Sequence, residues 1–318
     1  MRKYKYYMEF DGGGEKIAFP MGVIEGANDG PTICIVGGVH GAESCGVAGA
    51  IDLYNYLKPE NVSGKVIICT CFNRGALEQH VPFIVPQDNK SPLLGDRRTL
   101  PDDATYSDYM THFFQTRILD DVDYFVELHG GDVSEDLMDF VMYPVTGNDE
   151  VDKKSQQIAE VFDIRTVLRL PVDTPSTPGT KVLEASFVNM ATRGVPSLLA
   201  ESGQFGIYNP KNAATHLKGL KNILVSVGIL NEKIVKTNDR FCVKYISSMR
   251  SNYNGLWYPT KSIGDIVYKD ELIGEIRDYF GETIQQIFAP QDSLVTAMRS
   301  NLYINLGHAM YYLAEPKE

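Results

Sequence analysis

The sequence predicts an α/β protein with a mixed central sheet flanked by helices, followed by a small all-β domain. Short apolar runs alternate with helical patterns through the first two thirds of the chain, which is typical of sheets with parallel strands. From about residue 239, short strands and turns replace this alternation. A length of 318 residues exceeds what one domain usually needs, so we expect two domains, 1–238 and 239–318.

Each predicted strand and helix is supported by its own pattern of apolar residues. Apolar runs predict strands in the first domain at 32–39, 65–72, 124–128, 139–145, 166–170 and 195–200. Apolar residues at helical spacing predict helices around 47–57, 106–117 and 217–227, and Asp102 and Asp103 are candidate caps of the second. In the second domain, strands are expected at 241–246, 264–267, 272–276 and 287–290.

The motif His40-Gly41-Ala42-Glu43 closes the first of these apolar runs and opens a helical segment. A strand end lies at the carboxyl edge of an open sheet, where α/β folds collect ligand-binding groups, and glycine permits the turn that follows. Zinc in hydrolases commonly takes two histidines and one carboxylate and keeps a fourth position for water. His40 and Glu43 would supply two of these three ligands.

His129 is the candidate for the third ligand, because it follows the apolar run 124–128 and precedes Gly130. The other histidines fit less well. His112 and His216 fall inside helical patterns, His80 is in a loop-like stretch, and His308 is near the end of the chain. A strand-end histidine can also be a hydrogen-bonded structural residue, but two of them with a carboxylate favour a metal site.

Glu201 ends another apolar run, 195–200. A carboxylate beside a metal-bound water can take its proton and return it to a leaving amine, and partial desolvation raises its pKa toward that task. Glu201 is therefore the candidate catalytic base. A solvated carboxylate at the end of a strand is the alternative.

These residues carry a family resemblance. The block 37–43 resembles the first zinc motif of the succinylglutamate desuccinylase and aspartoacylase family, in the zinc carboxypeptidase clan. Glu127-Leu128-His129-Gly130 resembles its Asp-Leu-His motif, and 194–203 resembles its catalytic glutamate segment. The resemblance implies a zinc carboxypeptidase-like fold, one Zn²⁺ per chain held by His40, Glu43 and His129, and Glu201 as the general base. It also implies that the C-terminal β-domain is a lid, an assembly domain or a purely structural unit.

Two departures from the family pattern bear on the site. Glu127 stands where the family usually has aspartate; a carboxylate there would lie outside the ligand shell and orient the imidazole of His40. The family's Asn-Arg segment, which grips the substrate carboxylate, has no clean copy, and Asn89-Lys90 is the nearest remnant. A lysine weakens bidentate recognition of a carboxylate. Arg74, Arg97 and Arg98 are the other candidate substrate-binding residues. For any single one of these four cations, an exposed loop charge is the favoured interpretation.

Composition limits partners and location. The net charge of −11, without runs of Lys or Arg, argues against nucleic acid or an anionic membrane as partner. No apolar run is long enough for a membrane span, and the start lacks a signal-peptide pattern. Five cysteines without Cys-x-x-Cys spacing indicate reduced thiols, so a cytoplasmic location is expected. The sequence leaves homo-oligomerisation open.

The leading hypothesis is a zinc-dependent amidohydrolase that cleaves the amide of a small N-acylated amino acid or related compound. A carboxypeptidase acting on peptides would use the same metal chemistry. A non-catalytic zinc-binding or ligand-binding relative is a third hypothesis, motivated by the lost carboxylate-gripping segment and opposed by the presence of Glu201. The acyl group and the amine half of the substrate are not specified by the sequence.

Overall fold

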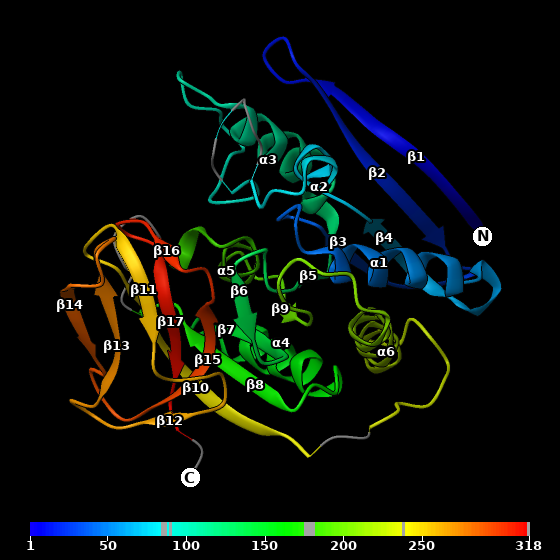
Figure 1. The fold of residues 1–318 in the computed structure, drawn as a ribbon. Helices are drawn as coiled ribbons and strands as arrows, with labels where there is room; N and C mark the ends of the chain where they lie inside the picture. Colours follow the sequence, from blue (N-terminus) through cyan, green and yellow to red (C-terminus); the bar gives the residue numbers. More distant parts are fainter. Residues whose placement is uncertain (84–87, 89–90, 175–181, 237–238, 317–318) are drawn as a thin grey trace.

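A mixed sheet forms the centre of the first domain (Figure 1). The computed structural model describes residues 1–83, 88, 91–174, 182–236 and 239–316. The strands of this sheet are β1 (Arg2–Asp11), β2 (Lys16–Glu25), β3 (Asn28–Gly37), β4 (Ser63–Cys69), β5 (Tyr124–His129), β7 (Phe140–Val145), β8 (Thr166–Pro171), β9 (Ser197–Glu201) and β10 (Phe241–Arg250). Their spatial order is β1-β2-β4-β3-β5-β9-β7-β8-β10. The neighbours β4, β3, β5 and β9 are parallel, whereas β2 and β7 run antiparallel to β4 and β9, which confirms the mixed sheet.

Helices cover both faces of the sheet. They are α1 (Ser44–Tyr56), α2 (Arg74–Gln79), α3 (Tyr106–Arg117), α4 (Asp149–Val161), α5 (Ser186–Thr192) and α6 (Pro210–Ser226), with short 3₁₀ turns at Pro59–Asn61, Leu119–Asp121 and Val182–Glu184. Successive strand residues point to opposite faces. Ile33 and Ile35 therefore pack in one core with α1, α4 and α6, and Cys34 and Val36 in another with α3 and α5. Because both faces are buried, the central strands are continuous apolar runs in the sequence.

Each strand predicted in the first domain overlaps an observed one, but some ends and caps differ. β3 ends at Gly37 because Gly38 adopts a left-handed conformation with φ of +65°. The N-cap of α3 is Thr105 and not Asp102 or Asp103, since Asp108 accepts a hydrogen bond from the Thr105 N–H at 2.9 Å. The hairpin of β1 and β2 was not predicted.

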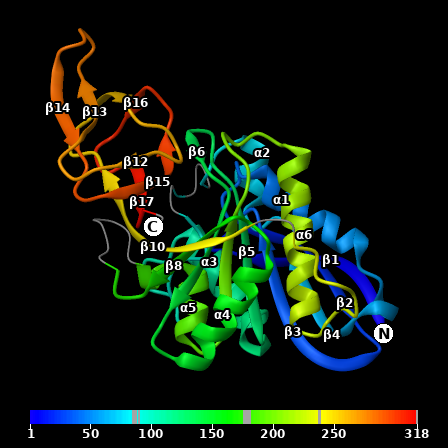
Figure 2. The same ribbon diagram turned by 90° about the horizontal axis from the view of Figure 1, so that it is seen from below.

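The C-terminal part is all-β, as expected, and β10 connects it to the first domain (Figure 2). Residues 241–244 of β10 pair with β8, and residues 245–250 pair with β17 (Ala309–Ala314). The sheet continues through β15 (Ser293–Arg299) to β12 (Ile266–Val267), and β6 (Glu135–Leu137) pairs with β15. The second sheet has the order β14 (Thr283–Phe288), β13 (Leu272–Arg277), β11 (Gly255–Pro259) and β16 (Tyr303–Ile304).

The C-terminal part has its own apolar core, in which the rings of Trp257 and Tyr311 meet edge to face with centroids 5.4 Å apart. The continuous sheet through β10 joins this core to the first domain. The division at 238/239 therefore stays a prediction about independent folding. The β6 and β15 pairing matters more for function, because it brings the C-terminal part to the carboxyl ends of the central strands.

Candidate active site

A glycine turn after β3 folds His40 back onto Glu43. The N–H groups of Phe72 and Asn73 donate to the carbonyl oxygens of Gly37 and Gly38, each at 2.8 Å, and so fix the start of the turn. At Gly41 a Cβ atom would lie 2.3 Å from the backbone of Ala76, so no other residue fits this approach to α2. Glu43 is the N-cap residue of α1. Its Oε1 lies 2.6 Å from His40 Nδ1.

His129 reaches the same carboxylate from the neighbouring strand. It is the last residue of β5, and its Nδ1 lies 2.7 Å from Oε2 of Glu43. Glu43 and His129 are each 3% exposed, while the side chain of His40 is 28% exposed. One donor atom from each of the three residues lies within 4.8 Å of the others. The structure thus brings together the three predicted ligands in a site that is accessible from the His40 side.

The electrostatics of this cluster suit a cation. Burial alone would raise the pKa of Glu43, but His40 and His129 lower it to about 2. Conversely, the carboxylate raises the pKa of His40, and that of His129 well above its usual value, although burial opposes both changes. Nε2 of His129 is buried without a hydrogen-bond partner in the described part of the chain. A negative carboxylate between the Nδ1 atoms of two imidazoles is a donor set that fits Zn²⁺.

Glu201 lies beside this cluster on β9. It is the register partner of His129, so the two side chains leave adjacent parallel strands at the same level. Burial raises the pKa of Glu201 well above its usual value, and the charges of Glu43 and Glu135 add to the effect. Oε2 of Glu201 is buried without a hydrogen-bond partner among the described residues. This carboxyl group is therefore available for proton transfer next to the donor set.

Glu127 contacts His129 and not, as predicted, His40. It lies two residues before His129 on β5, on the same face of the strand. Its Oε2 is 3.6 Å from His129 Nε2, and its Oε1 accepts a hydrogen bond from the Ser186 hydroxyl at the start of α5. The carboxylate therefore acts on the histidine of its own strand. Ser186 had no signal in the sequence.

The predicted substrate-binding cations have other partners in the structure. Arg97 pairs with Asp108 of α3 at 2.5 Å, and Arg98 with Asp120 at 2.8 Å. Arg74 begins α2, where it pairs with Glu78 at 3.1 Å and lies over the ring of Tyr7. Asn89 and Lys90 lie outside the described residues. Substrate binding by any of these five residues stays a prediction.

Two polar contacts that sequence patterns did not identify support the histidines. Ser91 Oγ lies 3.0 Å from Nε2 of His40, so the segment after the missing Asn-Arg motif reaches the site. His216 of α6 is fully buried and its Nε2 lies 3.0 Å from the carbonyl oxygen of His129. Burial lowers the pKa of His216 to about 4. This histidine therefore donates as a neutral imidazole and supports the end of β5.

A polar cluster formed by Glu135 of the first domain and two residues of the C-terminal part borders the site. Glu135 of β6 lies 3.5 Å from Nη2 of Arg299 on β15, and the Tyr312 hydroxyl of β17 donates to Glu135 at 3.4 Å. Burial and the nearby Asp132 raise the pKa of Glu135 to about 7, although Arg299 opposes the shift. The charge of Glu135 in turn raises the pKa of His40. Sequence patterns could not identify this cluster, because its members come from three strands without a shared motif.

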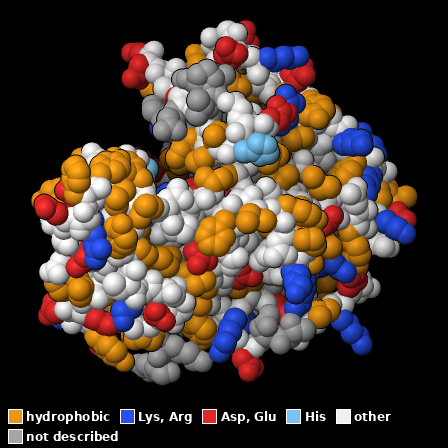
Figure 3. All heavy atoms as spheres, viewed as in Figure 1, with side chains coloured by type: hydrophobic (Ala, Val, Ile, Leu, Met, Phe, Trp, Pro, Cys, Tyr) orange, Lys and Arg blue, Asp and Glu red, His pale blue; other side chains and the backbone are white. Residues whose placement is uncertain are grey.

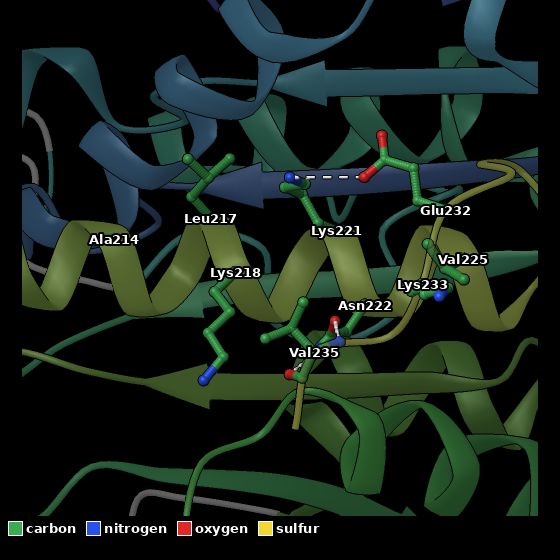
Figure 4. A pocket seen from close by; sticks show the side chains of 9 residues that line it. All are labelled: Ala214, Leu217, Lys218, Lys221, Asn222, Val225, Glu232, Lys233 and Val235. Carbon is green, nitrogen blue, oxygen red and sulfur yellow. Dashed lines mark hydrogen bonds and ion pairs between the residues drawn. The ribbon is translucent and has the colours of Figure 1, made fainter. Parts of the chain in front are cut away.

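Two cavities lie outside the donor set. One, of about 230 Å³, lies between α6 and residues 232–235, and Lys221 and Glu232 pair across it at 3.6 Å (Figure 4). The other, of about 160 Å³, lies beside the start of β2, the segment that follows β4 and the helices α2 and α3, and is lined partly by Asn73 and Arg74. On the face shown in Figure 3, Lys and Arg are scattered among acidic and apolar side chains. The exclusion of nucleic acid stays a prediction.

Comparison with known proteins agrees with this architecture. Residues 29–227 match the family model of the succinylglutamate desuccinylase/aspartoacylase catalytic domain. N-alpha-acetyl-L-2,4-diaminobutyric acid deacetylase of Halomonas elongata is 23% identical over 95% of this chain and 87% of its own length. The product-bound ectoine utilization protein EutE (DoeB) of Ruegeria pomeroyi superimposes with a TM-score of 0.84 at 20% identity, covering 99% of this chain and 95% of that one. A succinylglutamate desuccinylase/aspartoacylase of Rhodobacter sphaeroides gives 0.82 at 21% identity, covering 99% and 96%.

The two solved structures confirm the fold over nearly the whole chain, including the C-terminal β-domain. The family model spans most of the first domain and both strand-end motifs. The chain therefore belongs to the succinylglutamate desuccinylase/aspartoacylase family, as the ordered motifs predicted. It carries the catalytic domain of a family of amide deacylases.

Proposed function

We propose that this protein is a zinc-dependent deacylase that hydrolyses the amide bond of a small N-acylated amino acid. The observation that carries the proposal is the convergence of His40, Glu43 and His129, with the unpartnered carboxyl oxygen of Glu201 on the adjacent strand. The name of the Halomonas relative, an acetyl-diaminobutyrate deacetylase, supports the substrate class.

His40, Glu43 and His129 would hold one zinc ion per chain. Zinc bound there would lower the pKa of a water ligand and polarise an amide carbonyl. Glu127, held by Ser186, fixes the imidazole of His129 from the side away from Glu43, and His216 fixes the backbone of the same residue. A ligand supported in this way keeps its orientation while substrate enters from the exposed side of His40.

Glu201 would accept the proton of the attacking water and return it to the departing amine. Burial raises the pKa of Glu201, and a shift in this direction brings a carboxyl group closer to the working pH, where a general acid and base is most efficient. The charges around it tune that value in opposite directions. Glu43 and Glu135 raise the pKa of Glu201, whereas a positive charge at His129 lowers it.

The cluster of Glu135, Arg299 and Tyr312 would form the wall of the substrate pocket. Its side chains are largely buried and offer both acidic and basic groups at the rim of the donor set. Such a wall can orient a zwitterionic amino acid. Because Arg299 and Tyr312 come from the C-terminal part, that part would shape access to the site. The free state of all five cysteines supports a reducing compartment, and we propose a cytoplasmic location.

The experiment compares wild type with Glu201→Gln and His129→Ala for bound metal and for hydrolysis. The panel contains N-acetyl and N-succinyl amino acids, N-alpha-acetyl-diaminobutyrate and unblocked dipeptides. Wild type should bind about one zinc and release acid from an acylated amino acid, whereas Glu201→Gln should keep the metal and lose about a hundredfold or more in rate. His129→Ala should lose the metal.

Each unexpected result of this experiment would contradict a different part of the proposal. Unchanged turnover in Glu201→Gln would contradict the role of this carboxylate. Cleavage of dipeptides without acid release from the acylated substrates would replace the proposal by a carboxypeptidase. Zinc binding without hydrolysis of any panel member would favour a binding protein, and a folded wild type that binds no zinc would overturn the site itself.

A further inference from the structure

The outer strand β1 forms an open edge of the central sheet. Its ten residues pair with β2 on one side, from Arg2 opposite Glu25 to Asp11 opposite Lys16. Among the described residues no strand pairs with its other side, and β1 is the first strand in the sheet order. It lies at the rim of the molecule in both ribbon views (Figures 1 and 2). Such an edge presents a row of backbone N–H and C=O groups to another strand.

We propose that β1 pairs antiparallel with β1 of a second copy of this chain and so forms a twofold dimer with a continuous sheet. The charge order of the strand argues for this partner. Cations occupy its first half, at Arg2, Lys3 and Lys5, and acids occupy its second half, at Glu9 and Asp11. An antiparallel copy reverses this order, so the strand is complementary to itself.

The alternation of side chains selects one register. With Tyr7 on the twofold axis, Lys5 lies opposite Glu9 of the second copy, and symmetry repeats the pair. The same register places Lys3 opposite Asp11. Shifting the axis to Tyr6 leaves only Lys3 opposite Glu9, and shifting it to Met8 leaves only Lys5 opposite Asp11, so either shift halves the number of opposed charges. Odd-numbered residues share one face of the strand, which places the opposed charges side by side.

The side chains in question are accessible. No ion pair or hydrogen bond of Lys5 is seen within the described part of the chain. Glu9 pairs with Lys16 of the same hairpin at 2.6 Å, but its side chain is 49% exposed and keeps acceptor capacity. Lys3 contributes less, because its ammonium group already donates to the carbonyl oxygen of Leu57 at 2.8 Å. Arg2 is likewise paired with Glu25 at 2.7 Å, so the contacts to test are the Lys5 and Glu9 pairs.

Apolar surface on the strand points to the same conclusion. Tyr7 is 59% exposed, and Tyr4 and Tyr6, which stack on each other, are 38% and 39% exposed. Tyrosine is enriched in protein interfaces, because it combines a large apolar ring with a polar tip. In the proposed register Tyr7 meets its symmetry mate and Tyr6 lies opposite Met8. The dimer would bury both the open backbone edge and these rings.

Charge exchange tests the proposal by sedimentation velocity. Wild type should sediment as a dimer. In Lys5→Glu, a glutamate at residue 5 faces Glu9 of the other chain at both symmetry-related positions. In Glu9→Lys, two lysines face each other in the same way. Each variant should therefore raise the dissociation constant of the dimer about tenfold or more. An equimolar mixture of the two single variants should restore a dimer, because the two acids of one variant chain then lie opposite the two lysines of the other. The double variant Lys5→Glu/Glu9→Lys should dimerise by itself.

Lys233→Glu is the matched control, because it makes the same charge change at an exposed residue outside β1 and should leave the dimer intact. Thermal unfolding of each variant verifies that the fold is kept. A monomeric wild type, or a dimer that neither single substitution weakens, would overturn the proposal. So would two single variants whose mixture stays monomeric.

Discussion

Protonation of His216 should make the folded protein sensitive to mild acid. The imidazole is fully buried, and burial lowers its pKa to about 4, although its contacts with the carbonyl oxygens of Ser202 and His129 favour the charged form. The unfolded chain returns the group to an ordinary pKa of about 6.5. Replacing His216 by Gln removes the titration and keeps an N–H donor.

Proton binding by the unfolded chain sets the direction in which stability changes with pH. Below pH 6.5 the unfolded chain takes up a proton that the folded chain does not, so stability falls as the pH drops and the loss levels off near the folded pKa of about 4. At pH 5 the difference between the two pKa values corresponds to a loss of roughly 2 kcal/mol in the free energy of unfolding. The loss is absent at pH 7.5, where both states are neutral at this group.

The loss of unfolding free energy due to His216 can be measured by urea unfolding of wild type and His216→Gln. Both proteins are compared at pH 7.5 and pH 5 in the same zinc-containing buffer. Other titrating groups are common to both proteins and cancel in the difference. Wild type should lose about 2 kcal/mol more than His216→Gln between the two pH values. Equal losses in wild type and His216→Gln would refute the reasoning.

Two further predictions concern buried polar contacts. Ser186→Ala removes the hydroxyl that donates to Glu127 and should weaken zinc binding about tenfold in competition with a chelator, while Ser186→Thr should retain most of the affinity; equal affinity of both variants with wild type would contradict the support role. Asn222→Ala removes three contacts of 2.9 Å with Val161 and Val235 beside the cavity of Figure 4, and should lower the free energy of unfolding by roughly 3 kcal/mol in urea. A loss no larger than that of the surface variant Lys153→Ala, on α4 outside this cavity, would show that these bonds contribute little.

Sequence patterns located the candidate site residues best where these residues directly follow a predicted strand. Parallel neighbouring strands present their carboxyl ends at one edge, so the apolar runs before His129 and Glu201 were sufficient to bring these residues together. The glycine turn did the same for His40 and Glu43. The contact of Glu127 was assigned to the wrong histidine, because the side-chain spacing on β5 places it against His129.

The rest of the site depends on segments that meet only in the folded chain. Glu135, Arg299 and Tyr312 come from short strands whose pairing crosses the two domains, and no periodicity links them. Likewise, His216 and Ser186 are ordinary helical residues in the sequence until packing brings them against β5.

The sequence by itself determined the family, the α/β class and the residues offered to a metal, because strand ends and ordered motifs are local features. Tertiary structure decided which carboxylate supports which histidine, which side chains of the C-terminal part lie near the donor set, and that β1 is left as an open edge. These depend on long-range pairing and burial, where the energy of a contact is set by the environment that both partners share.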